Sequence, residues 1–366
     1  MNNMLEYQDI VAFHPGYYIV EDMEALGFTQ AEFAARLGTT EKTMSELLHG
    51  KCRISDELAQ KLANMLGTSI DVWINLQKEY DKRVLEIQRR KDLDKEKEII
   101  KCIDYSFFVR VAGLPNTRNV VEKLKNLYTF LKVSSLSVLL DKDLLVHFRT
   151  GVPNVRDKNI INSRAWVQTA ISLARDEDVD DFDAKKLKGH IQEIRAMTLK
   201  DPEEFIPRLK EIFKSCGVKF ILLPYLKNSG VNGAVYWEKS GSAILAMNDR
   251  RNDADTFWFA VFHEIKHVLQ EKRSRQFISF NKKTFTEDVS DVLEQEADEF
   301  SRNTLIPLSS YQDFILNDDF SEKSIIEFSN ELGVHPGIVL GRLQFENYVH
   351  YSRFKHLKTQ YKIVGV

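Results

Sequence analysis

The chain has 366 residues, 43% of them hydrophobic, and a formal net charge of −3 at pH 7. This length allows two or three domains with large cores, and the charge excludes a general affinity for nucleic acid or anionic membranes. We expect a cytoplasmic protein without a membrane segment, because the N-terminus lacks a signal-peptide pattern and no apolar run reaches spanning length.

Residues 1–80 have the pattern of a helix-turn-helix DNA-binding domain. Thr29 and Glu32 are spaced as a capping box, Gly38 ends that helix, and a second helix is predicted over 40–48. In this motif the second helix enters the major groove of operator DNA. Its exposed early residues and the basic residues just beyond are the expected DNA contacts: Thr40, Lys42, Thr43, Lys51 and Arg53.

The charge of this domain opposes the DNA-binding interpretation. Residues 1–80 contain six Lys and Arg but twelve Asp and Glu, whereas DNA-binding modules are normally basic. Two interpretations therefore stay open. The helix pair binds operator DNA, which would favour a homodimer, or it docks onto another protein.

Three further segments follow in the predicted domain organisation. Residues 81–101 are expected to form a charged connecting helix, with eight Lys and Arg and six Asp and Glu. Residues 102–200 form a helical middle region without a catalytic pattern, and residues 201–366 form the C-terminal domain. Amphipathic helices are predicted at 120–131, 163–175, 184–197 and 201–215.

A small sheet is predicted early in the C-terminal domain. Residues 217–224 read as a buried strand, and residues 234–238 and 243–248 read as a hairpin. An edge strand beside the following helix could pair with an extended substrate backbone, although it could equally be ordinary sheet.

The segment Phe262-His-Glu-Ile-Lys-His267 contains the pattern HExxH. It lies in residues 256–270, which contain no Gly or Pro and are apolar nearly all the way round, as in a buried helix. Histidines four residues apart project from one helix face and can both bind one zinc ion. His263 and His267 are therefore predicted metal ligands, and Glu264 is the predicted catalytic base.

A third ligand is expected on the next helical segment, which begins near Asp288. Val289, Val292, Leu293, Ala297 and Phe300 define an apolar stripe, and Glu296 falls near its centre while Glu294 lies well off it. We therefore predict Glu296 as the third zinc ligand, with Glu294 as the competing choice. Asp298 or Glu294 could orient a histidine N–H. Tyr225, Tyr236 and Arg342 are candidate stabilisers of an oxyanion.

These blocks resemble two known families. The first eighty residues are similar to XRE-type helix-turn-helix proteins of the HigA antitoxin kind, through His14-Pro-Gly16, Leu26-Gly-Phe-Thr-Gln30 and Leu48-His-Gly-Lys51. The C-terminal part resembles the ImmA/IrrE family of metallopeptidases through Asp255–His267, Glu294–Phe300, Leu305-Ile-Pro307 and Val334–Gln344. Two residues depart from the peptidase pattern: Lys266 replaces a small residue, and Ser301 replaces an alanine.

The resemblance implies an α+β, predominantly helical chain with a gluzincin-like C-terminal domain, a small sheet and a zinc-binding HExxH helix. It implies a zinc-dependent endopeptidase that cleaves or controls a transcriptional regulator in a stress, mobile-element or phage-defence response. The alternative hypothesis is a HigA-like antitoxin and transcriptional repressor, with a cognate toxin as partner and a C-terminal domain that only binds. An intact Glu264 favours the peptidase, because a binding module has no need of a general base.

Overall fold

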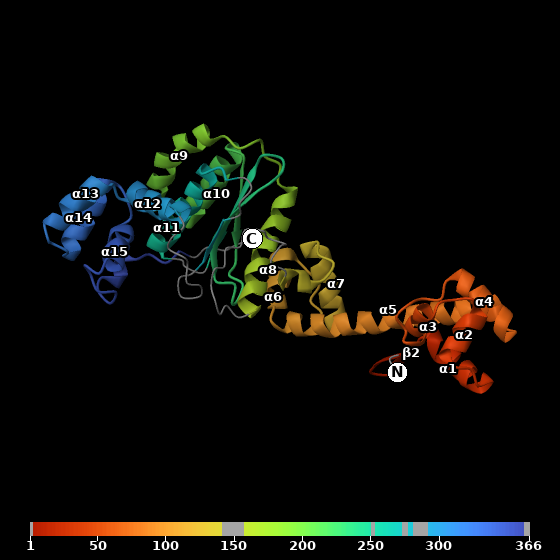
Figure 1. The fold of residues 1–366 in the computed structure, drawn as a ribbon. Coiled ribbons are helices and arrows are strands. Elements are labelled where there is room, and N and C mark those ends of the chain that lie inside the picture. The colour runs from red at the N-terminus through yellow and green to blue at the C-terminus, as the bar shows by residue number, and fades with distance from the viewer. Residues whose placement is uncertain (1–2, 141–156, 250–252, 273–276, 281–291, 362–366) are drawn as a thin grey trace. The chain divides into compact units, whose positions relative to one another are not determined.

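The computed structural model describes residues 3–140, 157–249, 253–272, 277–280 and 292–361 (Figure 1). Contacts divide the chain into two compact units, Met1–Lys95 and Glu96–Val366. The division falls within one long helix, α5 (Ile70–Lys101), so the helix expected over 81–101 begins earlier in the chain. The predicted middle region and C-terminal domain both lie within the second unit.

The first unit contains the predicted helix-turn-helix. A two-stranded antiparallel sheet precedes four short helices and the start of α5: β1 (Met4–Tyr7), β2 (Ile10–Phe13), α1 (Pro15–Leu26), α2 (Gln30–Leu37), α3 (Glu41–Leu48) and α4 (Asp56–Leu66). The capping box of Thr29 and Glu32 is present, and Gly38 ends α2 with a φ of 66°. Phe33, Met44 and Trp73 lie in one buried core that fixes α2, α3 and the start of α5 together.

The second unit begins with helices: α6 (Tyr105–Ala112), α7 (Val120–Leu131), α8 (Asp157–Leu173), α9 (Ala184–Ala196) and α10 (Pro202–Ser215). The predicted helices at 120–131, 184–197 and 201–215 are confirmed, whereas α8 begins earlier than the predicted 163 and α6 was not predicted. Short 3₁₀ segments are η1 (Leu136–Leu140), η2 (Ala174–Asp176) and η3 (Met197–Leu199). Asp201 is the N-cap of α10 as its position predicts, but its side chain makes no capping hydrogen bond, so Pro202 at the first turn is the stronger start signal.

A four-stranded mixed sheet lies at the centre of this unit. Its order is β3 (Val218–Leu223), β5 (Ala243–Asn248), β4 (Val231–Trp237) and β6 (Phe277–Phe280). β3 runs parallel to β5, whereas β4 is antiparallel to both β5 and β6. The predicted strand and hairpin are confirmed, while β6 is a short strand that the sequence analysis did not identify.

Helices cover both faces of the sheet (Figure 1). On one face, Trp166 of α8 donates its indole N–H to the Pro224 carbonyl at 3.1 Å, and Lys219 reaches the Ala174 carbonyl at 3.1 Å. On the other face, the alternate residues Phe220 and Leu222 join the core formed with α10 and α11 (Ala254–Leu269). β3 is consequently buried along its whole length.

The last elements pack around α11. They are α12 (Val292–Leu305), α13 (Leu308–Leu316), α14 (Glu322–Leu332), α15 (Pro336–Phe345) and η4 (Lys355–Leu357), with α12 and α15 in direct contact with α11. Within the described ranges, none of the helices is both long and apolar enough to span a membrane.

Candidate metal centre

α11 carries the HExxH residues in the interior of the second unit. Its apolar residues, among them Phe257, Val261 and Ile265, belong to the main core, which explains why this segment is a buried helix. His263 is 8% exposed, and Glu264 and His267 are fully buried. Three polar side chains at this depth need partners, because burying a polar or charged group without one is costly.

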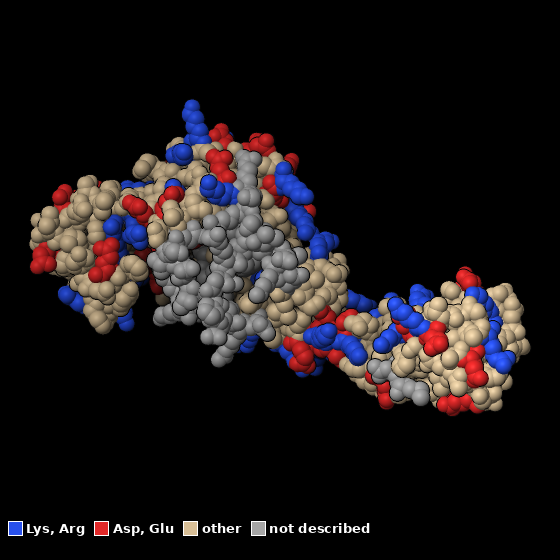
Figure 2. Space-filling model, in the orientation of Figure 1, with Lys and Arg blue, Asp and Glu red and all other residues tan. Residues whose placement is uncertain are grey.

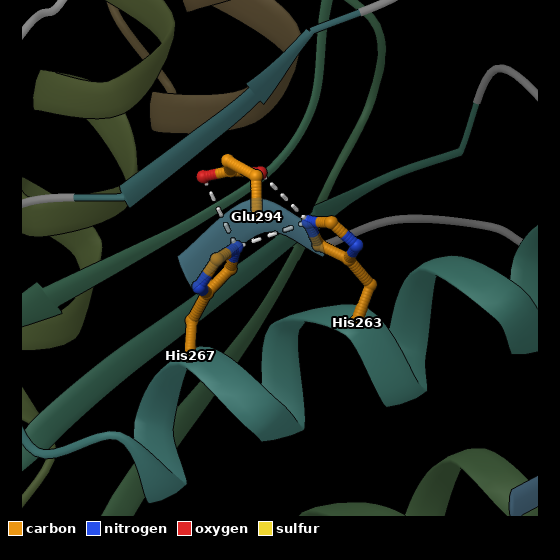
Figure 3. Close-up of side chains that lie close together, drawn as sticks. All are labelled: His263, His267 and Glu294. Carbon is orange, nitrogen blue, oxygen red and sulfur yellow. Dashed lines mark hydrogen bonds and ion pairs between the residues drawn. The ribbon is translucent and has the colours of Figure 1, made fainter. Parts of the chain in front are cut away.

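The two histidines converge on a carboxylate of α12 (Figure 3). Their Nε2 atoms lie 3.0 Å apart, and the Glu294 carboxylate oxygens lie 3.3 Å from His263 Nε2 and 3.4 Å from His267 Nε2. Among the residues that the structure describes, these three side chains form a possible metal-binding group, because their ligand atoms all lie within 4.8 Å of one another.

The spacing of these three donors fits a small tetrahedral cation. Zinc bonds of about 2.0 to 2.2 Å at tetrahedral angles place neighbouring donor atoms about 3.3 Å apart. The three observed donor separations are 3.0, 3.3 and 3.4 Å. Two imidazoles and one carboxylate also form the ligand set of known zinc hydrolases, and they leave a fourth position open.

The outer nitrogen of His263 supports the same arrangement. Nδ1 of His263 lies 3.0 Å from Oδ1 of Asp298. An ionised carboxylate can only accept a hydrogen bond, so Nδ1 carries the hydrogen and donates it. In the neutral ring, Nε2 then presents a lone pair toward His267 and Glu294, which is the form that a metal binds.

Strong electrostatic coupling accompanies this convergence. Burial acts to lower the pKa of His263, but hydrogen bonds with Asp298 and Glu294 and the nearby Glu264 charge outweigh it and raise that pKa to about 10. Burial acts to raise the pKa of Glu294, but hydrogen bonds with His263 and His267 hold it well below its ordinary range. These effects favour a protonated His263 beside an ionised Glu294.

The predicted third ligand, Glu296, is not brought to the histidines, and the structure corrects this choice to Glu294. Glu296 is directed to Lys266, whose Nζ lies 3.3 Å from Oε2, and to Gln270 Nε2 at 3.2 Å. Its side chain is 46% exposed, compared with 27% for that of Glu294. Hydrogen bonds from Gln270 and Lys266 lower the pKa of Glu296. The Glu296 carboxylate is therefore ionised and binds side chains at the end of α11.

Glu296 was chosen because the sequence analysis assigned the wrong face of α12 to the protein interior. Val292 anchored the predicted stripe but is 63% exposed, and Val289 lies outside the described residues. The buried face is instead marked by Ala297, Ser301 and Leu305, which are spaced four residues apart. Glu294 lies three residues before Ala297 on that face, so the later residues of the helix contained the correct signal.

Glu264 lies against the backbone of β4. A Cβ atom placed on Gly233 would come within 2.5 Å of Glu264 Oε1, so the Glu264 side chain would have to move. The register of β4 against β6 also shifts between Val231 and Gly233. Absence of a side chain at residue 233 thus makes room for the Glu264 carboxylate, a role that the sequence analysis did not assign.

Arg342, a candidate stabiliser of an oxyanion, instead contacts Glu346, the Ile306 carbonyl and Tyr311. Its Nε donates to Glu346 at 3.1 Å, one Nη donates to the Ile306 carbonyl at 3.2 Å, and its guanidinium lies 3.6 Å from the centre of the Tyr311 ring. These contacts join α15 to the end of α12 and to α13. Of the other two oxyanion candidates, Tyr225 uses its hydroxyl to accept the Asn228 amide at 3.1 Å, and Tyr236 lies in β4 opposite Ile244.

The predicted DNA-contacting residues lie at the start of α3 and just after it. Thr40 is the N-cap of α3, accepting from the Thr43 amide at 3.1 Å, and Lys42 is exposed in its first turn. Lys51 is exposed, whereas Arg53 forms an ion pair with Asp81 of α5. On the face drawn in Figure 2, basic and acidic side chains are interspersed over this unit.

Comparison with known proteins identifies the same region. Residues 19–73 match the Helix-turn-helix family. Over 63 residues the chain is 38% identical to the uncharacterized HTH-type transcriptional regulator YddM of Escherichia coli (strain K12), covering 17% of this chain and 67% of YddM. Over 69 residues it is 38% identical to virulence-associated protein A' of Dichelobacter nodosus, covering 19% of this chain and 60% of that protein.

A solved structure also aligns with part of the chain. An addiction module antidote protein of a HigA family from Coxiella burnetii shows 28% identity and a TM-score of 0.22, covering 23% of this chain and 94% of that one. The chain thus spans about two thirds of the length of YddM and 60% of the Dichelobacter protein. The family match, residues 19–73, does not include the residues that form the candidate metal centre.

Proposed function

The chain belongs, through its residues 19–73, to the helix-turn-helix family, and we propose that it is a transcriptional regulator whose second unit is a zinc-dependent endopeptidase. The observation that carries the enzymatic part is the convergence of His263, His267 and Glu294 beside a buried Glu264. A purely structural role for these residues would not require a carboxylate buried next to a second carboxylate.

In this proposal His263, His267 and Glu294 hold the zinc ion. When bound, zinc would supply Lewis acidity that makes water acidic enough to lose a proton near neutral pH. Glu264 would accept the water proton on a carboxylate oxygen as the water oxygen adds to the peptide carbonyl carbon, and would deliver it to the amine nitrogen as the C–N bond breaks. Asp298 keeps His263 Nε2 directed inward. The products are a new C-terminal carboxylate and a new N-terminal amine.

The sheet offers a surface for an extended substrate. In the described sheet β6 is the outermost strand beside β4, and Phe277 of β6 stacks on the His267 ring with centroids 4.1 Å apart. An outer strand can pair with a peptide backbone and present it to groups at its side. We infer that the substrate is an extended segment of a transcriptional regulator, brought near by the helix-turn-helix.

The enzymatic proposal is tested with a proteome-derived peptide library and the protein loaded with zinc. Bonds cut by the unaltered chain are identified by mass spectrometry, with Glu264→Gln as the matched variant because it keeps the size of the side chain and loses its basicity. Cleavage that disappears in Glu264→Gln and in the presence of a chelator supports the proposal. A set of cut bonds identical for both proteins contradicts it.

A second candidate function rests on the family match. The chain is then a repressor or antitoxin that binds operator DNA or a cognate toxin, and its second unit binds without cleaving. A reporter gene under the chain's own upstream region separates the two candidates. Glu264→Gln leaves reporter output unchanged if the protein acts only by binding, while substitution of Lys42 and Lys51 raises it.

A further inference from the structure

Gln270 joins one metal-ligand helix to the other. It is the C-cap of α11, three residues after His267. Its side-chain Oε1 lies 2.9 Å from Nδ1 of His267, and its Nε2 lies 2.9 Å from the Leu293 carbonyl and 3.2 Å from Glu296 Oε2. One amide therefore contacts a predicted ligand and the residue that immediately precedes Glu294.

The partners of the Gln270 amide determine which way it faces. A backbone carbonyl and a carboxylate can only accept hydrogen bonds, so the NH₂ group must face Leu293 and Glu296. The amide oxygen then faces His267 Nδ1, which must carry a hydrogen in order to donate to it. His267 Nε2 is consequently the bare nitrogen in the neutral ring, and it faces His263 Nε2 and Glu294.

The same amide holds α12 in register with α11. Its bond to the Leu293 carbonyl fixes the backbone one residue before Glu294. Lys266 strengthens the connection through its ion pair with Glu296, the acid that also accepts from Gln270. We name these four residues, Lys266, Gln270, Leu293 and Glu296, the interhelix clamp.

We propose that Gln270 is a positioning residue that fixes the His267 tautomer and sets the position of Glu294 through the interhelix clamp. The part concerning zinc rests on the proposed function, whereas the tautomer is a property of the metal-free protein. The interhelix clamp also gives Lys266 and Glu296 a role: they bind each other outside the ligand cluster and strengthen the contact between its two helices.

The test compares Gln270→Met, which keeps the length of the side chain and removes both polar groups, with Gln270→Glu, which keeps an acceptor for His267. Gln312→Met, at an exposed position of α13, is the matched control. The full chain is labelled with ¹⁵N-histidine, and long-range ¹H–¹⁵N spectra of the metal-free protein report which ring nitrogen carries the hydrogen. The His267 signals are assigned from their loss in His267→Ala.

We expect the unaltered chain, Gln312→Met and Gln270→Glu to show His267 with hydrogen on Nδ1, and Gln270→Met to show a mixture of tautomers. Zinc affinity, measured by competition with a chromophoric chelator, should fall by about 10- to 100-fold in Gln270→Met, as for other partners of metal-binding histidines. Circular dichroism and thermal unfolding confirm that each variant is folded.

Two results overturn the proposal: a His267 tautomer in Gln270→Met that equals that of the unaltered chain, or a zinc affinity equal to that of Gln312→Met. Failure of the unaltered chain to bind zinc is a different outcome. It contradicts the proposed function and the zinc part of the positioning role together, while the spectra of the metal-free protein still decide whether Gln270 fixes the His267 ring.

Discussion

Glu264 lies so close to Gly233 that a methyl group at residue 233 would come within 2.5 Å of its carboxylate oxygen. The contact joins the candidate base on α11 to the backbone of β4, where the register against β6 shifts. A side chain at position 233 would force the Glu264 carboxylate to move from this place. The position of the base thus depends on a residue that has no functional group.

Gly233→Ala should displace Glu264 and slow peptide cleavage by about 100-fold, since a shift of about 1 Å in a reacting group has an effect of that size. Zinc content should be unchanged, because none of the three ligands is altered. Cleavage rate and bound zinc are measured on the same preparation. Gly189→Ala in α9 is the control, because a Cβ there meets nothing within 4 Å. Equal rates for the two variants would show that the contact has no catalytic consequence.

Asp298→Ala removes the acceptor that orients His263 through Nδ1. Zinc affinity should fall by about 10- to 100-fold, because partners of metal-binding histidines fix the ring and increase its basicity. Competition with a chelator measures the effect. Asp313→Ala, at an exposed position of α13, should bind zinc as the unaltered chain does. An Asp298→Ala protein with undiminished affinity would assign the carboxylate to helix packing alone.

DNA binding should depend on the two exposed lysines at the start of α3 and after it. Lys42→Ala and Lys51→Ala should each weaken binding to DNA from the chain's own upstream region and reduce the slope of log affinity against log salt by about 1. Lys61→Ala is the control, because Lys61 is held by Glu57 at 2.8 Å and by the Gly38 carbonyl at 3.2 Å. An unchanged slope in both test variants would favour protein docking by this unit.

His14 should make α1 sensitive to acid. Its Nδ1 accepts from the Gly16 amide and its Nε2 donates to the Cys52 carbonyl, both at 3.0 Å, so the ring must be neutral. Burial lowers the pKa of His14 below its ordinary value of 6.5, although the Cys52 carbonyl and the charge of Asp81 oppose this; the ring of Tyr80 packs against it.

A lowered pKa means that the unfolded chain binds a proton more readily than the folded one as the pH falls below 6.5. The stability contributed by this cap, about 1 kcal/mol, is therefore present above that pH and lost below it. Hydrogen exchange of α1, corrected for intrinsic rates, should become less protected between pH 7.5 and pH 5.5. His14→Asn, which caps without titrating, should remove that pH dependence; a loss of protection equal in both proteins would exclude His14 as its source.

The sequence predicted those features that depend on local spacing. The HExxH residues lie together because two histidines four apart must share a helix face, and Thr29, Glu32 and Gly38 delimit α2 because capping is a local interaction. The hairpin of β4 and β5 followed from two apolar runs joined by a short turn. These predictions required no knowledge of tertiary contacts.

The features that were missed depend on contacts between distant segments. Glu294 and Glu296 are two residues apart, so a small error in the assigned buried face of α12 changes which of them is expected to face the histidines. The packing of α12 on α11 decides between them, and in the sequence only the spacing of Ala297, Ser301 and Leu305 indicates the same face. Gly233 and Gln270 appear ordinary in the sequence. Their roles arise because β4 passes beside Glu264 and because the end of α11 meets Leu293.

The most direct test of the metal centre is the zinc content of three proteins: the unaltered chain, Glu294→Gln and Glu296→Gln. Each is purified after expression in zinc-supplemented medium, dialysed against a weak chelator, and analysed for metal per chain by elemental mass spectrometry. We expect close to one zinc per chain in the unaltered protein and in Glu296→Gln, and almost none in Glu294→Gln. Zinc retained by Glu294→Gln but lost from Glu296→Gln, or no zinc in the unaltered chain, would contradict this expectation.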